Sequence, residues 1–255
     1  MKNFHTHTDR CGHAEGSVSA YVDAARKCNI THLGFSDHVP LPDNRWNIRM
    51  PYSELPLYVR DINQAQEKYT DIEIYLGAEC DFSSELLTYF EDELIGEYQF
   101  DYLIGGVHFI QTDGEWLNCY HAENNKRSLI TYTDNLLEVI ACDLFSFIVH
   151  PDLFGVFYDS WDDNARSCSK EILKAASSKN RIFEINGSGY RKKIRSSKGM
   201  RRPYPLNQFW EMAAEYDIPV TINSDAHRPE DINNFGDGFL LADKLELKIV
   251  DPPFI

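Results

Sequence analysis

Closely spaced histidines open the chain, in the stretch FHTHTD at residues 4–9. His5 and His7 are two residues apart, and residues i and i+2 of an extended backbone point to the same side. Their imidazoles are therefore expected to project together into one site, as a chelating pair for a metal ion. An isolated pair of this kind is more often a polar chain start or a purification-tag remnant, so the metal interpretation depends on the rest of the sequence.

Ionisable or polar residues also stand at the ends of six later apolar runs. The runs occupy residues 31–38, 72–79, 101–108, 144–150, 181–186 and 219–227. They end at Asp37, His38, Glu79, His108, His150, Asn186, Asp225 and His227. Six of the nine histidines lie at such ends when His5 and His7 are included, and His13 follows in the first loop. A single histidine of this kind is usually structural, but the joint pattern indicates one shared site.

The chemistry of this set is that of a transition-metal site. The nine candidate ligands are His5, His7, His13, His38, Glu79, His108, His150, Asp225 and His227. Imidazole with carboxylate suits zinc, iron or manganese, and the set contains too much nitrogen for a calcium or magnesium site. Since one tetrahedral ion needs only four ligands, the number of candidates predicts two or three divalent ions.

The apolar runs themselves have the length and composition of strands. Between several of them lie segments with helical periodicity, at residues 18–25, 129–140 and 206–213. With the NFHTHT start, the runs make seven strands alternating with helices, which predicts successive βα units and a parallel sheet. A barrel is favoured over an open, doubly wound sheet, because the carboxyl ends of barrel strands meet on one face.

Composition limits the function classes. A chain of 255 residues with 43% apolar residues fits one α/β domain, predicted to span residues 1–255, or two small ones. The formal charge of −15 argues against a nucleic-acid partner, and no stretch is long and apolar enough to predict a membrane span. Six cysteines without CxxC spacing predict reduced thiols and a cytoplasmic location. The sequence makes no prediction about the oligomeric state.

One segment departs from the acidic average. Residues 191–202, RKKIRSSKGMRR, contain seven of the 25 basic residues and no acid. Such a run is either a solvated flexible loop or a local anion-binding site beside the predicted metals.

These motifs resemble the polymerase and histidinol phosphatase (PHP) superfamily. The similar stretches are FHTHTD at 4–9, GFSDH at 34–38, GAECDF at 77–82, GGVHF at 105–109, VHPDL at 149–153 and SDAH at 224–227. The stretches EINGSGYRKK at 184–193, RPYP at 202–205 and SDAHRPEDI at 224–232 are similar to its histidinol-phosphate phosphatase branch. The resemblance implies a distorted (β/α)7 TIM-like barrel, the PHP fold, as a single metal-dependent phosphatase domain.

The resemblance also implies an allocation of ligands to three metals. One metal would be held by His5, His7, Glu79 and Asp225, with Glu79 bridging to a second. The second would also be held by His108 and His150, and a third by His13, His38 and His227. The remaining histidines, His32 and His121, are interpreted as structural, and Cys11 as a neighbour of the site and not a ligand.

The phosphate side of the site is predicted at the Gly-Ser-Gly turn after the sixth strand. Arg191 would aim a planar, bidentate donor at phosphate, helped by Ser188 and by backbone amides of Gly187 and Gly189. Lys192, Lys193, Arg201 and Arg202 are expected to act mainly through long-range attraction. Asp37 would orient His38 or, as the alternative, transfer the proton of the leaving group.

The implied activity is hydrolysis of L-histidinol phosphate to L-histidinol and phosphate, a step of histidine biosynthesis. The chain would then be a phosphoric monoester hydrolase, acting on a small-molecule substrate with no nucleic-acid or membrane partner. Three alternatives remain at the level of the sequence: a PHP-type phosphodiesterase or exonuclease, a phosphatase of another small phosphate ester, and a metal-binding protein without catalysis. A metal-binding protein without catalysis would have no use for the basic run at residues 191–202.

Overall fold

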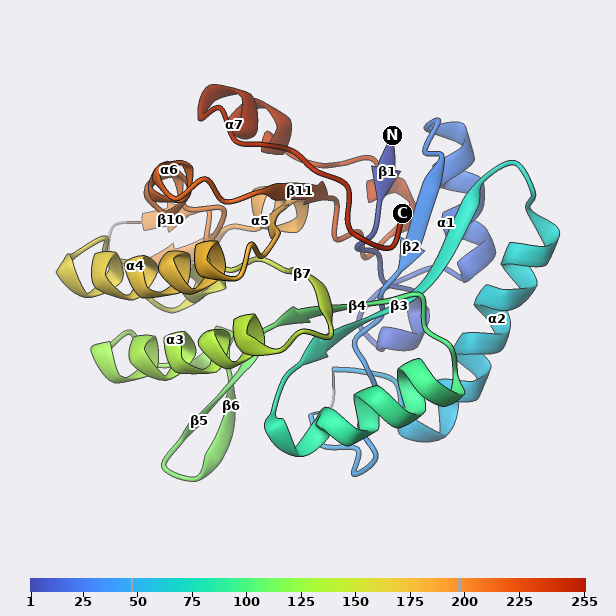
Figure 1. Cartoon of the computed structure of the whole chain (residues 1–255), viewed down its shortest axis with the longest axis horizontal. Helices are drawn as coiled ribbons and strands as arrows, with labels where there is room; N and C mark the ends of the chain where they lie inside the picture. Colours follow the sequence, from blue (N-terminus) through green and yellow to red (C-terminus); the bar gives the residue numbers. More distant parts are fainter. Residues whose placement is uncertain (47, 197–198) are drawn as a thin grey trace.

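Seven parallel strands form the centre of the molecule (Figure 1). The computed structural model describes residues 1–46, 48–196 and 199–255. The strands are β1 Lys2–Asn3, β2 His32–Phe35, β3 Glu73–Asp81, β4 Tyr102–Gly106, β7 Phe145–Ile148, β8 Phe183–Asn186 and β11 Val220–Asn223. Each pairs in parallel with the next along the chain, and a parallel bridge between Thr6 and Ala226 joins the two ends. The sheet is therefore a nearly closed barrel, as predicted.

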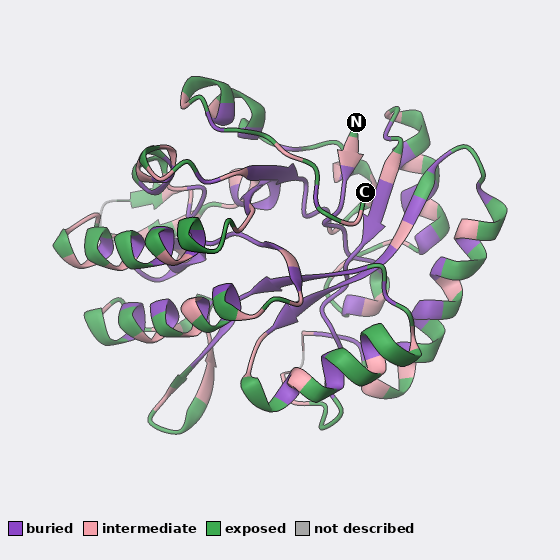
Figure 2. Cartoon of the chain, viewed as in Figure 1, coloured by how far each residue is buried: buried purple, intermediate pink, exposed green. Residues whose placement is uncertain are grey.

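Helices surround this sheet (Figure 1). They are α1 Val18–Lys27, α2 Leu55–Lys68, a π-helical segment Tyr89–Glu97, α3 Lys126–Ala141, α4 Asp163–Ser178, α5 Gly187–Arg191, α6 Asn207–Glu215 and α7 Gly238–Lys244. Side chains of Ser17, Asn125 and Asp162 cap the first turns of α1, α3 and α4 by accepting backbone N–H groups. The longer helices bury one face and expose the other, whereas most residues of the seven barrel strands are buried (Figure 2). Within the described part of the chain, no helix combines the length and apolar character needed to span a bilayer.

Two antiparallel hairpins are present in addition to the predicted strands and helices. The first joins β5 Phe109–Thr112 to β6 Glu115–Asn118, and Asp113 and Gly114 make its turn with φ of 54° and 86°. The second joins β9 Ile194–Ser196 to β10 Gly199–Arg201, within the basic run. The described part of that run is thus the end of α5 and a hairpin; Ser197 and Lys198 lie outside the described residues.

Aromatic residues close the barrel interior near the start of its strands. The ring of Tyr102 stacks on Phe254 at 4.3 Å, and its hydroxyl donates a hydrogen bond to the carbonyl of Phe4. A Cβ added at Gly34 or Gly77 would lie 2.2 or 2.3 Å from Tyr102, so these glycines make room for the ring. The polar residues lie beyond this layer, at the carboxyl ends of the strands.

Candidate metal centre

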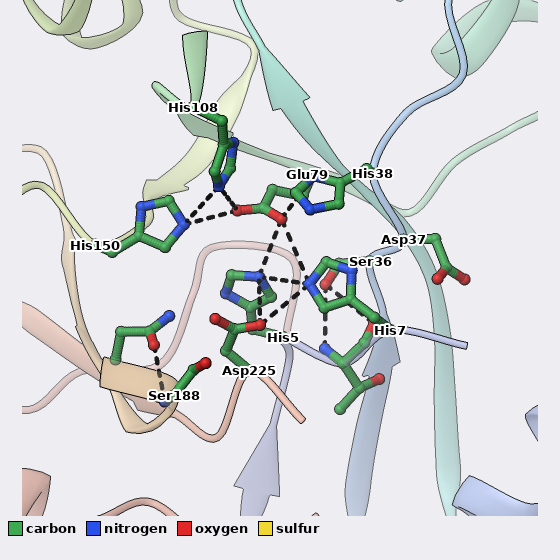
Figure 3. A network of polar contacts seen from close by, with 12 residues as sticks. His5, His7, Ser36, Asp37, His38, Glu79, His108, His150, Ser188 and Asp225 are labelled. Atoms are coloured by element: carbon green, nitrogen blue, oxygen red, sulfur yellow. Dashed lines mark hydrogen bonds and ion pairs between the residues drawn. The ribbon is translucent and has the colours of Figure 1, made fainter. Parts of the chain in front are cut away.

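The predicted ligands meet at the carboxyl end of the barrel, and Figure 3 shows seven of them around the carboxylate of Glu79. The other two, His13 and His227, lie beside His7. Seven of the nine follow five different strands; Glu79 lies within a sixth strand, β3, and His13 follows the short helical turn Asp9–Cys11. His5 and His7 project to the same side although β1 itself is only two residues long, and their Nε2 atoms lie 3.0 Å apart. The predicted convergence is therefore a feature of the structure, while the metal-binding role of each residue stays a prediction.

Both oxygens of Glu79 are surrounded by imidazoles. Its Oε1 lies 2.8 Å from His150 Nε2 and 3.3 Å from His108 Nε2. Its Oε2 lies between 3.1 and 3.4 Å from nitrogens of His5, His7 and His38. Burial raises the pKa of Glu79, but the imidazoles of His38, His108 and His5 lower it by more than burial raises it. The pKa of Glu79 is therefore well below its ordinary value. Glu79 is thus an ionised carboxylate that can bridge two cations.

Asp225 extends the cluster on the side of His5 and His7. Its Oδ1 lies 3.2 Å from His7 Nε2 and 3.6 Å from His5 Nε2. Asp225 and His150 both have positive φ, 48° and 30°. A non-glycine residue in this region is strained, and such strain is often kept at functional sites.

His13 and His227 form a more exposed part of the cluster. Their Nε2 atoms lie 3.0 Å apart, and the ring of His227 stacks on His7 at 4.3 Å. The atoms that could share one ion are those of His7, His38 and His227, which all lie within 4.8 Å of one another. His13 joins this group through His227, and its ring lies 5.3 Å from that of His38.

The chemistry of these donors fits metal ions. The facing Nε2 pairs are His5 with His7 at 3.0 Å, His108 with His150 at 3.2 Å, and His13 with His227 at 3.0 Å. His13 Nδ1 contacts the carbonyl oxygen of Cys11, and His227 Nδ1 contacts that of Asp225. These oxygens can only accept, so in the two neutral rings the protons are on Nδ1 and both lone pairs are on Nε2. Lone pairs that face one another repel unless a cation lies between them. The arrangement therefore suits metal coordination better than hydrogen bonding.

Two further carboxylates, not predicted from the sequence, contact the Nδ1 atoms of predicted ligand histidines, on the side of each ring opposite the cluster. Glu184 Oε1 lies 2.8 Å from His5 Nδ1, and Asp81 Oδ1 lies 3.2 Å from His108 Nδ1. Each fixes the proton on Nδ1 and leaves Nε2 free for a metal. Their signal in the sequence is alternation, since Asp81 is two residues from Glu79 and Glu184 is two residues from Asn186.

Asp37 lies beside the cluster and points away from Glu79 (Figure 3). Its carboxylate accepts hydrogen bonds from Thr8 N at 2.7 Å and Cys11 Sγ at 2.7 Å, and Cys11 Sγ lies 3.2 Å from His7 Nδ1. Burial raises the pKa of Asp37 to about 6. The described contacts connect Asp37 to His7 through Cys11, whereas the sequence predicted a direct contact with His38.

A cavity of about 520 Å³ opens over the cluster. Seven of its lining residues are predicted metal ligands, and we call the full set of nine predicted ligands the metal wall. Ser188, Arg191, Lys192 and Tyr204 line another part, which we call the basic wall. His121, interpreted from the sequence as structural, also lines the cavity. A concave site of this size fits a small molecule.

The basic wall begins with α5. The side-chain oxygen of Asn186 accepts hydrogen bonds from the backbone N–H groups of Ser188 and Gly189, at 2.9 and 3.4 Å. A Cβ at Gly187 would lie 2.6 Å from the carbonyl oxygen of Asn234, so close packing requires glycine there. Phosphate binding by these residues stays a prediction, and two of the amides already have a partner in Asn186.

The neighbours Arg191 and Lys192 both line the cavity but differ in the groups to which they donate hydrogen bonds. Arg191 lines the cavity, but its Nη atoms donate to the carbonyl oxygens of Asn234, Ser224 and Asp225, at 2.7 to 2.9 Å. Lys192 is expected from the sequence to act mainly through long-range attraction. It lies at the cavity instead, where its Nζ donates to the hydroxyl of Tyr120 at 2.8 Å.

Comparisons with known proteins agree with this geometry. The family model described as "PHP domain" matches residues 3–188. A protein of Deinococcus radiodurans named "Probable histidinol-phosphatase" is 31% identical over 250 residues, covering 95% of this chain and 90% of that protein. The "Histidinol-phosphatase" of Bacillus subtilis is 25% identical, covering 92% of this chain and 97% of that protein.

A solved structure shares the fold. The crystal structure of a histidinol phosphate phosphatase from Lactococcus lactis, complexed with zinc, L-histidinol and phosphate, superimposes with a TM-score of 0.75. The match covers 98% of this chain and 95% of that one, at 18% identity. The predicted PHP-type barrel is confirmed.

Proposed function

We propose a function for this chain from one premise: it belongs to the PHP domain family, in the histidinol-phosphatase branch. The chain is a metal-dependent phosphomonoesterase that hydrolyses L-histidinol phosphate to L-histidinol and phosphate. This reaction belongs to histidine biosynthesis. The observation that carries the proposal is the buried cluster of imidazoles around Glu79, which opens into a cavity sized for a small molecule, in a chain that matches histidinol-phosphatases over nearly its whole length.

One catalytic domain spans residues 1–255 in this proposal. The family model ends at residue 188, but β11 pairs with β8 and completes the barrel. Asp225 and His227 follow β11 and face the cluster. The last quarter of the chain thus supplies a strand and two candidate ligands to the same site.

The cluster would hold two or three divalent transition-metal ions. The groups that the structure brings together are His5, His7 and Asp225; Glu79, His108 and His150; and His7, His38 and His227. The Lactococcus lactis relative is complexed with zinc, which makes zinc the first candidate before manganese or iron. When bound, such ions supply a water-derived nucleophile at neutral pH and positive charge for the oxygens of the phosphate.

The chain's own groups position this chemistry. Glu184 and Asp81 hold His5 and His108 with Nε2 toward the cluster, and Asp37 acts on His7 through Cys11. Arg191, with Ser188, Gly187 and Gly189, is proposed for the phosphate side of the cavity. Because Arg191 also bonds the carbonyls of Ser224 and Asp225, it holds the loop that carries a candidate ligand.

The substrate is proposed to be a small phosphate ester, with no nucleic-acid or membrane partner. An overall charge of −15 repels a polyanion, and the cavity is the size of a metabolite site. We place the protein in the cytoplasm, where reduced thiols persist, because all six of its cysteines are free.

The test is a substrate comparison on metal-loaded protein. Phosphate release from L-histidinol phosphate, 4-nitrophenyl phosphate and a dinucleotide would be measured beside elemental analysis of bound metal. We expect kcat/KM for L-histidinol phosphate to exceed that for the aryl ester by at least about 100-fold, because a specific pocket must also recognise the leaving group. Preferential cleavage of the dinucleotide would contradict the proposal in favour of a phosphodiesterase.

A further inference from the structure

Lys192 occupies an unusual position for a lysine. Its side chain leaves the end of α5 and enters the cavity, where Nζ donates hydrogen bonds to Tyr120 Oη at 2.8 Å and Tyr204 Oη at 3.2 Å. The same ammonium lies 5.1 and 5.7 Å from the centres of these two rings. An ammonium has three donors, so this clamp of two tyrosines leaves one donor for another partner.

The other lysine and arginine side chains that line the cavity, within the described residues, are already engaged. Arg228 pairs with Glu15 at 2.9 Å. Arg191 donates to three backbone carbonyls and lies 3.7 Å from Asp231. Lys192 has only neutral hydroxyls as partners, and no carboxylate of the described chain lies within 4.0 Å of it. It is therefore the cation of this cavity that still lacks a counter-ion.

A partly buried ammonium without a counter-ion is costly in a protein. Desolvation disfavours the charge, and the usual remedy is a carboxylate in contact. This chain has 40 acidic residues, yet none is placed against Lys192. Burial lowers the pKa of Lys192, but Tyr120 and the field of Asp225 raise it more, so the side chain stays protonated. The arrangement keeps one positive charge available for an anion that enters from solution.

The position of the clamp identifies that anion. Tyr204 is buried, and its ring lies 6.0 Å from that of His150, a predicted ligand in the metal wall. An anion that contacts the metal wall is therefore within the same cavity as the free donor of Lys192. Phosphate oxygens are strong acceptors for an ammonium, and Lys is a common phosphate-binding point charge.

We propose that Lys192, held by the hydroxyls of Tyr120 and Tyr204, is a phosphate-binding residue of this site. It binds a non-bridging oxygen of the substrate's phosphate group and of the inorganic phosphate product. The role with the ester rests on the proposed function. Binding of inorganic phosphate by Lys192 does not rest on the proposed function, and it is therefore measured separately.

The experiment compares Lys192→Met with Lys193→Met, which removes the same charge from an exposed neighbour. For each metal-loaded variant, inhibition by inorganic phosphate and kcat/KM are measured with metal content. For Lys192→Met we expect the inhibition constant of phosphate to rise at least about 30-fold, because a charge-assisted contact is lost, with metal content unchanged. Lys193→Met should change it less than about threefold. Equal inhibition constants in the two variants would overturn the proposal.

Two further measurements separate phosphate binding from other roles. A contact with phosphate oxygens lowers kcat/KM for L-histidinol phosphate and for 4-nitrophenyl phosphate by similar factors. A loss confined to L-histidinol phosphate, whose alkoxide leaves poorly, would overturn the proposal by making Lys192 a proton donor to the leaving group. Tyr204→Phe keeps the ring and the ammonium, so a several-fold rise in the inhibition constant of phosphate is expected from loss of one clamp hydroxyl.

A variant that does not fold and a wild-type protein that does not hydrolyse the ester each have a separate control. If Lys192→Met does not fold, Lys192→Gln retains a polar side chain and is expected to show the same rise in the inhibition constant of phosphate. If the wild-type protein does not hydrolyse L-histidinol phosphate, the proposed function fails, but calorimetric titration of metal-loaded protein with inorganic phosphate still tests Lys192. Unchanged phosphate affinity in Lys192→Gln would overturn the proposal.

Discussion

The metal wall and the basic wall of the cavity are positioned in different ways. Except for His13, the side chains of the metal wall lie in or just after barrel strands, whose parallel pairing sets the direction of each residue. Those of the basic wall come from the five-residue helix α5 and from the segment before α6. Strand register aims a side chain by its place in the sequence, whereas a short helix end depends on what packs around it.

Three consecutive basic residues show the consequence. Arg191 bonds backbone carbonyls, Lys192 enters the cavity, and Lys193 is exposed to solvent. Three adjacent basic residues of one run thus have three different surroundings. Substitutions in the metal wall should therefore have large effects that follow from strand position alone, and those along the basic run should have graded effects.

The largest effect is expected from Glu79→Gln. An amide cannot bridge two cations, so we expect kcat to fall at least about 1,000-fold and metal content to fall with it, while circular dichroism stays that of a folded barrel. Glu73→Gln, on the exposed start of the same strand β3, is the matched control and should behave as wild type. Full activity of Glu79→Gln, or of wild type after exhaustive chelation, would contradict a multinuclear site.

Arg191→Ala is expected to have the next largest effect. It removes a cation and fork-shaped donor from the basic wall, so kcat/KM should fall roughly 30- to 1,000-fold, with metal content retained. Arg191→Lys should recover only part of the loss, because an ammonium cannot make the planar set of contacts. If Arg191→Ala loses metal together with activity, Arg191 acts by holding the loop that carries Asp225. Near-normal kinetics of Arg191→Ala would contradict both this role and a role in phosphate binding.

Glu184→Gln tests the layer behind the metal wall. The amide has the same shape but is a weaker acceptor for His5 Nδ1–H, which makes the ring a poorer ligand. We expect metal affinity and activity to fall about 10- to 100-fold, as is typical when such a partner of a ligand is changed. Competition with a chelator of known affinity measures the metal affinity. An unchanged metal affinity would show that His5 needs no such support.

The smallest effects are expected from Lys193→Met and Arg202→Gln. Lys193 is exposed, and Arg202 donates to Asn207 and lies over the ring of Tyr190. Each should lower kcat/KM less than about threefold, and the loss should vanish at high salt because screening removes long-range attraction. A larger, salt-independent loss would place that residue in contact with substrate and would weaken the distinction between the two walls.

Much of the metal wall could be predicted because its signal is local. Residues such as Glu79 and His150 stand where an apolar run meets a polar residue, and this switch marks the carboxyl end of a buried strand. Glu184 carries the same kind of signal, as a carboxylate inside the apolar run RIFEIN, but it was overlooked because Asn186 ends that run. The hairpin of β5 and β6 was also missed, although Asp113-Gly114 is a turn signal.

The sequence by itself determined the fold class, the order of seven strands and the convergence of nine candidate ligands, because periodicity and strand ends are properties of neighbouring residues. Only the tertiary structure decided which basic residue of the cavity is held by tyrosine hydroxyls and keeps a donor free. Lys192 is separated by 72 residues from Tyr120 and by 12 from Tyr204, the two hydroxyls that hold it. Contacts of that separation depend on how β6, α5 and the chain before α6 pack together, and no local pattern records them.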